Sequence, residues 1–141
     1  MDTSPLRLIE VTRVEAMRLL GSVPVGRIVF TQHALPAIRP VNHLVEGSDV
    51  VVRTHPGAAV VSAVGEAAGV VVAYEADEIS ATTRAGWTVI VTGTARLVHD
   101  AADAAGYESA LRPWAAGDMS QIIRISADIV TGYKLEQPAG A

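Results

Sequence analysis

The chain has 141 residues, of which 50% are hydrophobic and 18% are charged, with a formal net charge of −4 and no cysteine. Its length fits one domain, residues 1–141, and no apolar run approaches the roughly 18 residues that a membrane-spanning helix needs. The missing thiols exclude disulfides, zinc fingers, iron–sulfur clusters and cysteine catalysis, and the acidic balance argues against nucleic-acid binding, so we expect a cytoplasmic protein without membrane or nucleic-acid partners.

Helix signals occur at three places. Residues 12–15 (TRVE) have the Ser/Thr-x-x-Glu form of a capping box, and the apolar residues that follow end at Gly21. Asp100 is a suitable N-cap for a segment of helix formers that runs to Leu111. The apolar segment Ala58–Val64 lies between turn residues and fits two helical turns, although its pattern alone would also fit a strand. The sequence therefore predicts three short helices.

The rest of the apolar pattern is typical of β-strands separated by turns. Residues 32–35 and 46–48 indicate tight turns, and Gly93 predicts a bend or bulge in the longest strand. Pro40 has no N–H for a ladder, so its strand should contain an unpaired stretch or a bulge there. The predicted strands are Gly26–Thr31, Pro36–Val45, Asp49–Thr54, Gly69–Glu75, Trp87–His99, Gln121–Ser126 and Ile129–Leu135.

Strands that follow one another through short turns favour an antiparallel sheet, and about six of them close best into a small barrel. We therefore expect a mainly β fold with a few short flanking helices. The strand Gly69–Glu75 should be buried on both faces, with a polar connection over 76–86. Residues 1–9 and 137–141 are expected to be frayed ends.

Several residue types that often carry chemistry lack a supporting pattern. The four histidines, His33, His43, His55 and His99, have no spacing typical of a metal site, so turn and strand positions explain them better. The acidic residues at 75, 77 and 78 fit a solvated loop better than a cation site. Neither Ser62 nor Ser80 lies in a G-x-S-x-G motif, and no glycine-rich dinucleotide or P-loop motif occurs. The sequence predicts no metal centre and identifies no catalytic residue.

Two polar segments interrupt otherwise apolar strands. Residues 39–42 (RPVN) combine a cation, a rigid residue and an amide, and the Asn42 side chain offers both a donor and an acceptor to a heterocycle. Residues 53–57 (RTHPG) place Arg53 and Thr54 at a strand end beside a turn. A guanidinium binds phosphate bidentately, and backbone N–H groups of a turn complete such a cradle. On composition alone, a surface ion pair at a strand end is the slightly favoured explanation of Arg53.

The order of the segments PVGRIVF, PAIRPVNHLVEGSDVVVRTHPG, VVVAYEADEI and GWTVIVTGTARLV resembles the pyridoxamine 5′-phosphate oxidase-like family. The similarity is greatest to its small flavin-binding branch, which also contains nitroimidazole-resistance proteins, and it covers residues 10–135. The resemblance implies a six-stranded antiparallel split β-barrel, a homodimer, and FMN held in a groove between the subunits. In some actinobacterial members the deazaflavin F420 replaces FMN.

The resemblance also implies roles for individual residues. It places the flavin ring and ribityl chain against Arg39, Pro40, Val41 and Asn42, and the phosphate near Arg53 and Thr54. It places Trp87 and Trp114 near the groove, the second donated by the partner subunit; without the resemblance, core or interface packing explains both indoles.

One position departs from the family pattern. Where the family commonly has a lysine two residues after the glycine of the RTHPG turn, this chain has Ala59, and its single lysine is Lys134. The first hypothesis is an FMN-dependent oxidoreductase acting on a small planar substrate. The alternatives are an F420-dependent oxidoreductase and a non-enzymatic binding or sensing dimer without a tightly held flavin, which Ala59 favours.

Overall fold

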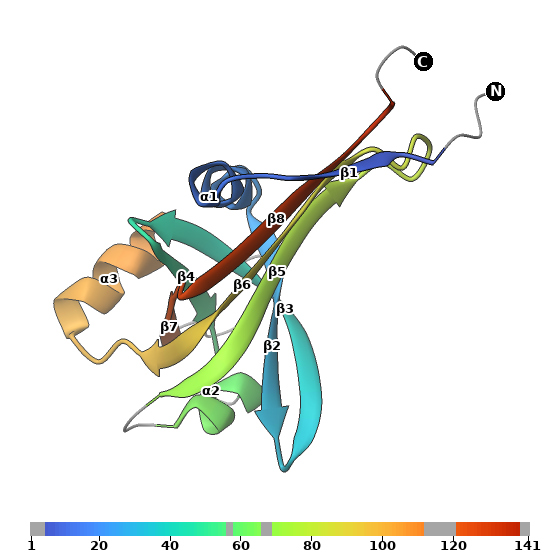
Figure 1. Ribbon diagram of the computed structural model, residues 1–141. Helices are drawn as coiled ribbons and strands as arrows, with labels where there is room; N and C mark the ends of the chain where they lie inside the picture. The colour runs from blue at the N-terminus through green and yellow to red at the C-terminus, as the bar shows by residue number, and fades with distance from the viewer. Residues whose placement is uncertain (1–4, 56–57, 66–68, 112–120, 139–141) are drawn as a thin grey trace.

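The computed structural model describes residues 5–55, 58–65, 69–111 and 121–138. Within these ranges the chain forms eight strands and three helices (Figure 1), and every helix and strand that the sequence predicts is present. In chain order they are β1 (Arg7–Glu10), α1 (Arg13–Gly21), β2 (Val25–Gln32), β3 (Leu35–Glu46), β4 (Asp49–Thr54), α2 (Ala59–Val64), β5 (Val70–Ile79), β6 (Gly86–Leu97), α3 (Ala101–Ala110), β7 (Gln121–Ser126) and β8 (Ile129–Glu136).

Six of the strands form a closed antiparallel barrel, as predicted. They pair in the order β6–β5–β2–β3–β4–β7, and β7 pairs with β6 to close the ring. β8 pairs with the first half of β6, and β1 pairs with β8. β1 and the end of β8, together with the adjoining ends of β5 and β6, form an arm that projects from the barrel (Figure 1). The segment Arg7–Glu10 is thus a strand where a frayed end was expected.

Gly93 lies where β6 changes partners. Residues 86–92 of β6 pair with β8, whereas residues 95–97 pair with β7. A Cβ atom at position 93 would lie 1.5 Å from the carbonyl oxygen of Ser126. The predicted bend is therefore a point of close backbone approach that requires glycine.

The N-cap half of the capping box predicted for α1 is formed, because the Oγ1 atom of Thr12 accepts a hydrogen bond from the N–H of Glu15 at 3.2 Å, while the Glu15 carboxylate binds Arg18. The helix packs closely on β8: a Cβ atom on Gly132 would lie 2.8 Å from the Cβ atom of Ala16. The absence of a side chain at Gly132 thus lets helix and strand approach each other. Within the described ranges, no helix is long and apolar enough to cross a membrane.

Pro40 stays in register with Arg27 of β2, and its missing N–H is accommodated at the open side of β3. The N–H of His43 donates to Pro24 on the β2 side. Backbone N–H groups alternate between the two sides of a strand, so the nitrogen at position 40 points away from β2. On that side β4 begins to pair only at Asn42. This is the unpaired stretch that the sequence predicts.

The apolar side chains form two clusters. The larger one fills the barrel with residues such as Ile28, Val52, Tyr74 and Val89. The smaller one, Val51, Leu111 and Ile122, lies on the outer face of β4 and β7, with residues of α3 packed against it. α3 therefore lies over the face of β4 that also carries Arg53.

Two expectations about β5 are wrong. The strand continues to Ile79, so the polar connection to β6 is limited to residues 80–85. Val71, expected to be buried, has 71% of its surface exposed. Its side chain lies on the outer face of the barrel wall, because successive residues of a strand point to opposite faces and Val72 points inward.

Candidate functional site

The structure brings Asn42 and Arg53 together on the outer face of the barrel. They are directly opposite each other in the β3–β4 ladder. Such cross-strand neighbours have Cβ atoms about 5 Å apart. Asn42 is 5% exposed and Arg53 is half-buried. The Nη1 atom of Arg53 donates to the carbonyl oxygen of Leu111, just after α3, at 2.7 Å. A guanidinium and an amide are thus held side by side.

The pleat of β4 separates Arg53 from Thr54. Val50 and Val52 point into the barrel core, so Thr54 shares their face and Arg53 faces outward. Thr54 is buried, opposite Gln121 of β7. The two residues that the resemblance assigns to a phosphate therefore lie on opposite sides of one strand.

The same alternation divides residues 39–42 of β3. Val41 is buried in the barrel core, whereas Asn42 faces outward. Arg39 and Pro40 are exposed, on the part of β3 that extends beyond β4. The Arg39 guanidinium lies 5.9 Å from the centroid of the Phe30 ring, and its Nη1 atom donates to the carbonyl of Ile38 at 2.7 Å. These contacts hold Arg39 near the β2–β3 hairpin rather than beside Arg53.

Trp87 is part of the barrel core in this chain. It is the second residue of β6, between Glu78 and Lys134 in the register, and is buried. Leu97 lies ten residues further along β6 and pairs with Ile123 of β7. The preceding residue of β7, Ile122, pairs with Arg53. Trp87 and Arg53 therefore lie toward opposite ends of the barrel wall. Trp114 lies outside the described residues.

The departure at position 59 has a structural counterpart. Ala59 is the first residue of α2 and packs against the barrel core. Lys134 is on β8, where its Nζ atom lies 3.3 Å from Glu15 of α1. Neither position provides a cation to the surroundings of Arg53.

A buried polar pair that the sequence analysis did not identify lies inside the barrel. The Nε2 atom of His43 is 2.8 Å from the carbonyl oxygen of Leu20, and its Nδ1 atom is 2.5 Å from the hydroxyl of Tyr74. A carbonyl only accepts, so Nε2 carries the proton and Nδ1 accepts from Tyr74. Burial lowers the pKa of His43 and raises that of Tyr74. No local motif signals a pair whose members are 31 residues apart.

The remaining candidates have structural roles. Glu75 and Asp77 lie on β5, not in a loop, with their carboxylates 2.8 Å and 3.6 Å from Arg27 of β2. Ser80 caps the β5–β6 turn by accepting from the N–H groups of Thr82 and Thr83. Among the residues that the structure describes, no three histidine, aspartate or glutamate side chains are grouped as metal ligands would be.

Comparison with known proteins identifies the family. The family model described as pyridoxamine 5′-phosphate oxidase matches residues 12–137. The chain belongs to this family. A relative from Mycobacterium tuberculosis (strain ATCC 25618 / H37Rv), named uncharacterized protein Rv0080, is 49% identical over 134 residues, covering 94% of this chain and 88% of the relative. The resemblance seen in the sequence is thereby confirmed.

Two solved structures of related proteins have the same architecture. The FAD binding protein from Mycobacterium smegmatis is 35% identical, with a TM-score of 0.72, over 90% of this chain and 97% of that one. A Corynebacterium glutamicum protein named after pyridoxamine 5′-phosphate oxidase is 28% identical, with a TM-score of 0.77, over 98% of both chains. The split barrel of this pyridoxamine 5′-phosphate oxidase family member is thus shared with a flavin-binding protein.

Proposed function

We propose that this protein is a flavin-dependent oxidoreductase that holds its cofactor beside Asn42 and Arg53 and acts on a small planar substrate in the cytoplasm. The observation that carries the proposal is the cross-strand pairing of these two side chains on the outer face of a split barrel. Membership of the family and the relatedness to an FAD binding protein support it.

The chemistry of the two side chains fits a flavin nucleotide. The Arg53 guanidinium, oriented by the Leu111 carbonyl, suits a phosphate oxygen, because charge-assisted hydrogen bonds to arginine are short and strong. The amide of Asn42 offers a donor and an acceptor to the edge of a heterocycle. When bound, the flavin would supply the hydride or electron transfer, so the protein's own residues bind and orient rather than react. FMN is our first choice of cofactor, and FAD fits the same donors.

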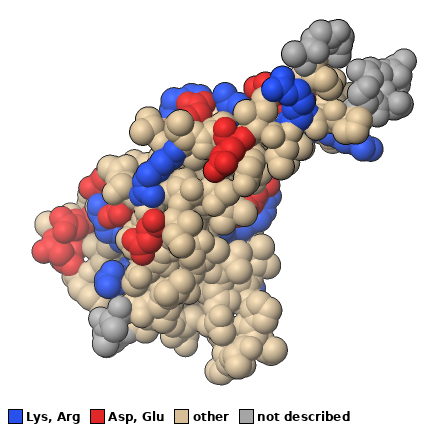
Figure 2. Space-filling model, in the orientation of Figure 1, with Lys and Arg blue, Asp and Glu red and all other residues tan. Residues whose placement is uncertain are grey.

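We propose further that the protein is a homodimer with the cofactor groove between its subunits. Exposed aliphatic side chains lie on one stretch of the sheet, in which β2 separates β3 from β5: Ile38 on β3, Val71 on β5, Ile90 on β6 and Ile129 on β8. Figure 2 shows that most of the middle and lower part of this side of the molecule carries no charged residue. Large apolar patches on a small protein typically mark an interface. A second copy of the chain would cover this one.

Ala59 supports an alternative cofactor. With the alanine packed on the core and Lys134 close to Glu15, the site offers one fewer cation than the family pattern implies. The second candidate is the deazaflavin F420, because the missing cation weakens the case for the phosphate of FMN. A binding or sensing dimer without a tightly held flavin is the third.

The test is the spectrum and mass of the small molecule that copurifies with the protein, measured for wild type and for Arg53→Ala. A flavin absorption spectrum with an FMN or FAD mass supports the proposal, an F420 mass supports the alternative, and a colourless protein that takes up neither contradicts both. Arg53→Ala should reduce flavin occupancy at least tenfold. Arg18→Ala, which removes a guanidinium paired with Glu15 on α1, is the matched control and should leave occupancy unchanged.

A further inference from the structure

A pocket of about 400 Å³ lies between α1 and the β3–β4 turn, away from Asn42 and Arg53. Its lining includes Arg13, Met17 and Arg18 of α1 together with Val45 and Ser48. Val45 is three residues from Asn42, about 10 Å along β3, and its side chain points to the opposite face of the strand. The volume is within the range of small-molecule sites. The inference below is independent of the proposed flavin site.

The floor of this pocket is apolar. Met17 and Val45 are partly buried and pack against the barrel core from two different elements. Val14, on the rim, has 81% of its surface exposed. A methionine side chain adapts its shape to an apolar ligand, because it is unbranched and polarizable. The floor therefore suits the hydrocarbon part of a ligand.

The polar edge of the pocket is formed by Arg13 and Ser48, which Ala127 holds in place. Arg13 Nη2 donates to the carbonyl oxygen of Ala127, and the N–H of Ala127 donates to the carbonyl oxygen of Ser48. No carboxylate of the described residues lies within ion-pair distance of Arg13. The Arg13 guanidinium has five N–H donors, of which the Ala127 carbonyl takes one. This edge therefore presents a positive charge beside a hydroxyl.

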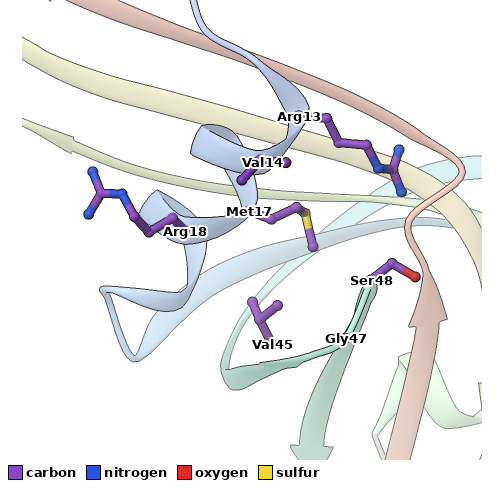
Figure 3. Close-up of a pocket in the computed structure, with 7 residues that line it drawn as sticks. All are labelled: Arg13, Val14, Met17, Arg18, Val45, Gly47 and Ser48. Carbon is purple, nitrogen blue, oxygen red and sulfur yellow. The ribbon is translucent and has the colours of Figure 1, made fainter.

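Arg18 differs from Arg13 although both line the pocket. Its Nε and Nη2 atoms bind the two carboxylate oxygens of Glu15, at 2.8 Å and 2.6 Å. Figure 3 shows that Arg13 and Arg18 extend to opposite sides of α1, with Arg13 on the side of Ser48. The charge available to a ligand in the pocket is therefore that of Arg13.

We propose that this pocket binds a small carboxylate with an apolar body. The carboxylate oxygens bind the guanidinium of Arg13 and the hydroxyl of Ser48, and the hydrocarbon part lies on Met17 and Val45. The pocket favours anions, because Arg13 lines it and none of the described residues in its lining is acidic. It also favours a ligand with an apolar body over a fully polar anion, because a fully polar anion would leave the apolar floor in contact with water.

The test is a titration of the purified protein with octanoate, followed by NMR or calorimetry, with acetate and 1-octanol as control ligands. Octanoate should bind at least tenfold more tightly than either control, since acetate lacks the hydrocarbon chain and octanol lacks the charge. Octanol binding as tightly as octanoate would show a merely apolar surface and overturn the proposal.

Three variants assign the binding to this pocket. Arg13→Gln should weaken octanoate binding about tenfold or more, because it removes the charge. Arg96→Gln, an exposed arginine of β6 that does not line the pocket, is the matched control and should change the affinity less than twofold. If Arg13→Gln does not fold, Ser48→Glu in the exposed turn replaces it: the added carboxylate should neutralise Arg13 and abolish binding. Unchanged octanoate affinity in Arg13→Gln or Ser48→Glu would contradict the proposal.

Discussion

His43 and Tyr74 form a hydrogen-bonded pair inside the barrel, with the tyrosine hydroxyl donating to the Nδ1 atom of the histidine at 2.5 Å. The rings meet edge to face, with their centroids 5.1 Å apart. Because Nε2 donates to Leu20, the pair links α1, β3 and β5 through one neutral imidazole. Protonation would put a charge into the core and replace the acceptor at Nδ1 by a donor.

The first prediction concerns pH. The pKa of His43 is lowered by burial, so the unfolded chain binds a proton here more readily than the folded protein. The contribution of neutral His43 to the free energy of unfolding is therefore complete above the pKa of histidine in the unfolded chain, about 6.5, and is lost as the pH falls below that value. His43→Gln should therefore unfold more easily at pH 7 but lose less stability between pH 7 and 5, measured by urea denaturation. The exposed His99→Gln is the control; an unchanged slope in His43→Gln would contradict the prediction.

The second prediction concerns Gly93. Gly93→Ala should destabilise the protein by about 3 kcal/mol, because its Cβ atom would lie 1.5 Å from a backbone oxygen that cannot rotate away. Gly106→Ala is the control with the opposite sign: nothing lies within 4 Å of its Cβ atom, and alanine stabilises a helix by about 0.5–1 kcal/mol. Thermal unfolding of both variants measures the difference. Equal melting temperatures would show that the β6 crossover is not as tight as described.

The third prediction concerns the proposed dimer. Ile90→Glu places a charge at the border of the exposed apolar face, opposite Glu75 of β5. Burying that charge on association is costly, so we expect the dimer to weaken at least tenfold while the far-ultraviolet circular dichroism stays that of the wild type. Sedimentation velocity at several concentrations is the measurement. Val14→Glu, on the exposed side of α1, should not change the association. A wild-type monomer at micromolar concentration would remove both the dimer and the shared groove.

The fourth prediction concerns Ala59. If the cofactor is a phosphorylated flavin, Ala59→Lys should tighten its binding by about 1–2 kcal/mol, roughly 5- to 30-fold. The gain should fade as salt rises, because exposed charges are screened over about 8–10 Å at physiological ionic strength. The aliphatic part of the lysine has to lie along the core surface that Ala59 now contacts. Titration with FMN at low and high salt is the measurement.

Ser62→Lys is the control for this prediction, because it adds the same charge to an exposed position of α2. It should tighten binding less than Ala59→Lys does. An FMN affinity that Ala59→Lys leaves unchanged at both salt concentrations would count against FMN and favour the non-enzymatic dimer.

Apart from β1, the sequence alone was sufficient to predict the helices and strands and their closure into a barrel. Local patterns determine these features: the capping box at Thr12, the turns around residues 33 and 47, and the glycine at 93 each act within a few residues. The short connections between strands left few alternatives to an antiparallel barrel. The extent of β5 and the pairing of β1 were not predictable in this way, because both depend on partners far along the chain.

The candidate site likewise combines residues that the sequence identifies with contacts that only the tertiary structure decides. The sequence identified Asn42 and Arg53 as polar residues in apolar strands, and the tertiary structure made them neighbours by setting the register of β3 against β4. The same register and pleat separated Thr54 from Arg53 and placed Arg39 beside Phe30. The His43–Tyr74 pair exists only because β3 and β5 enclose one core. Residue types and local turns follow from the sequence, whereas long-range register, which depends on packing the whole barrel, decides which of these side chains meet.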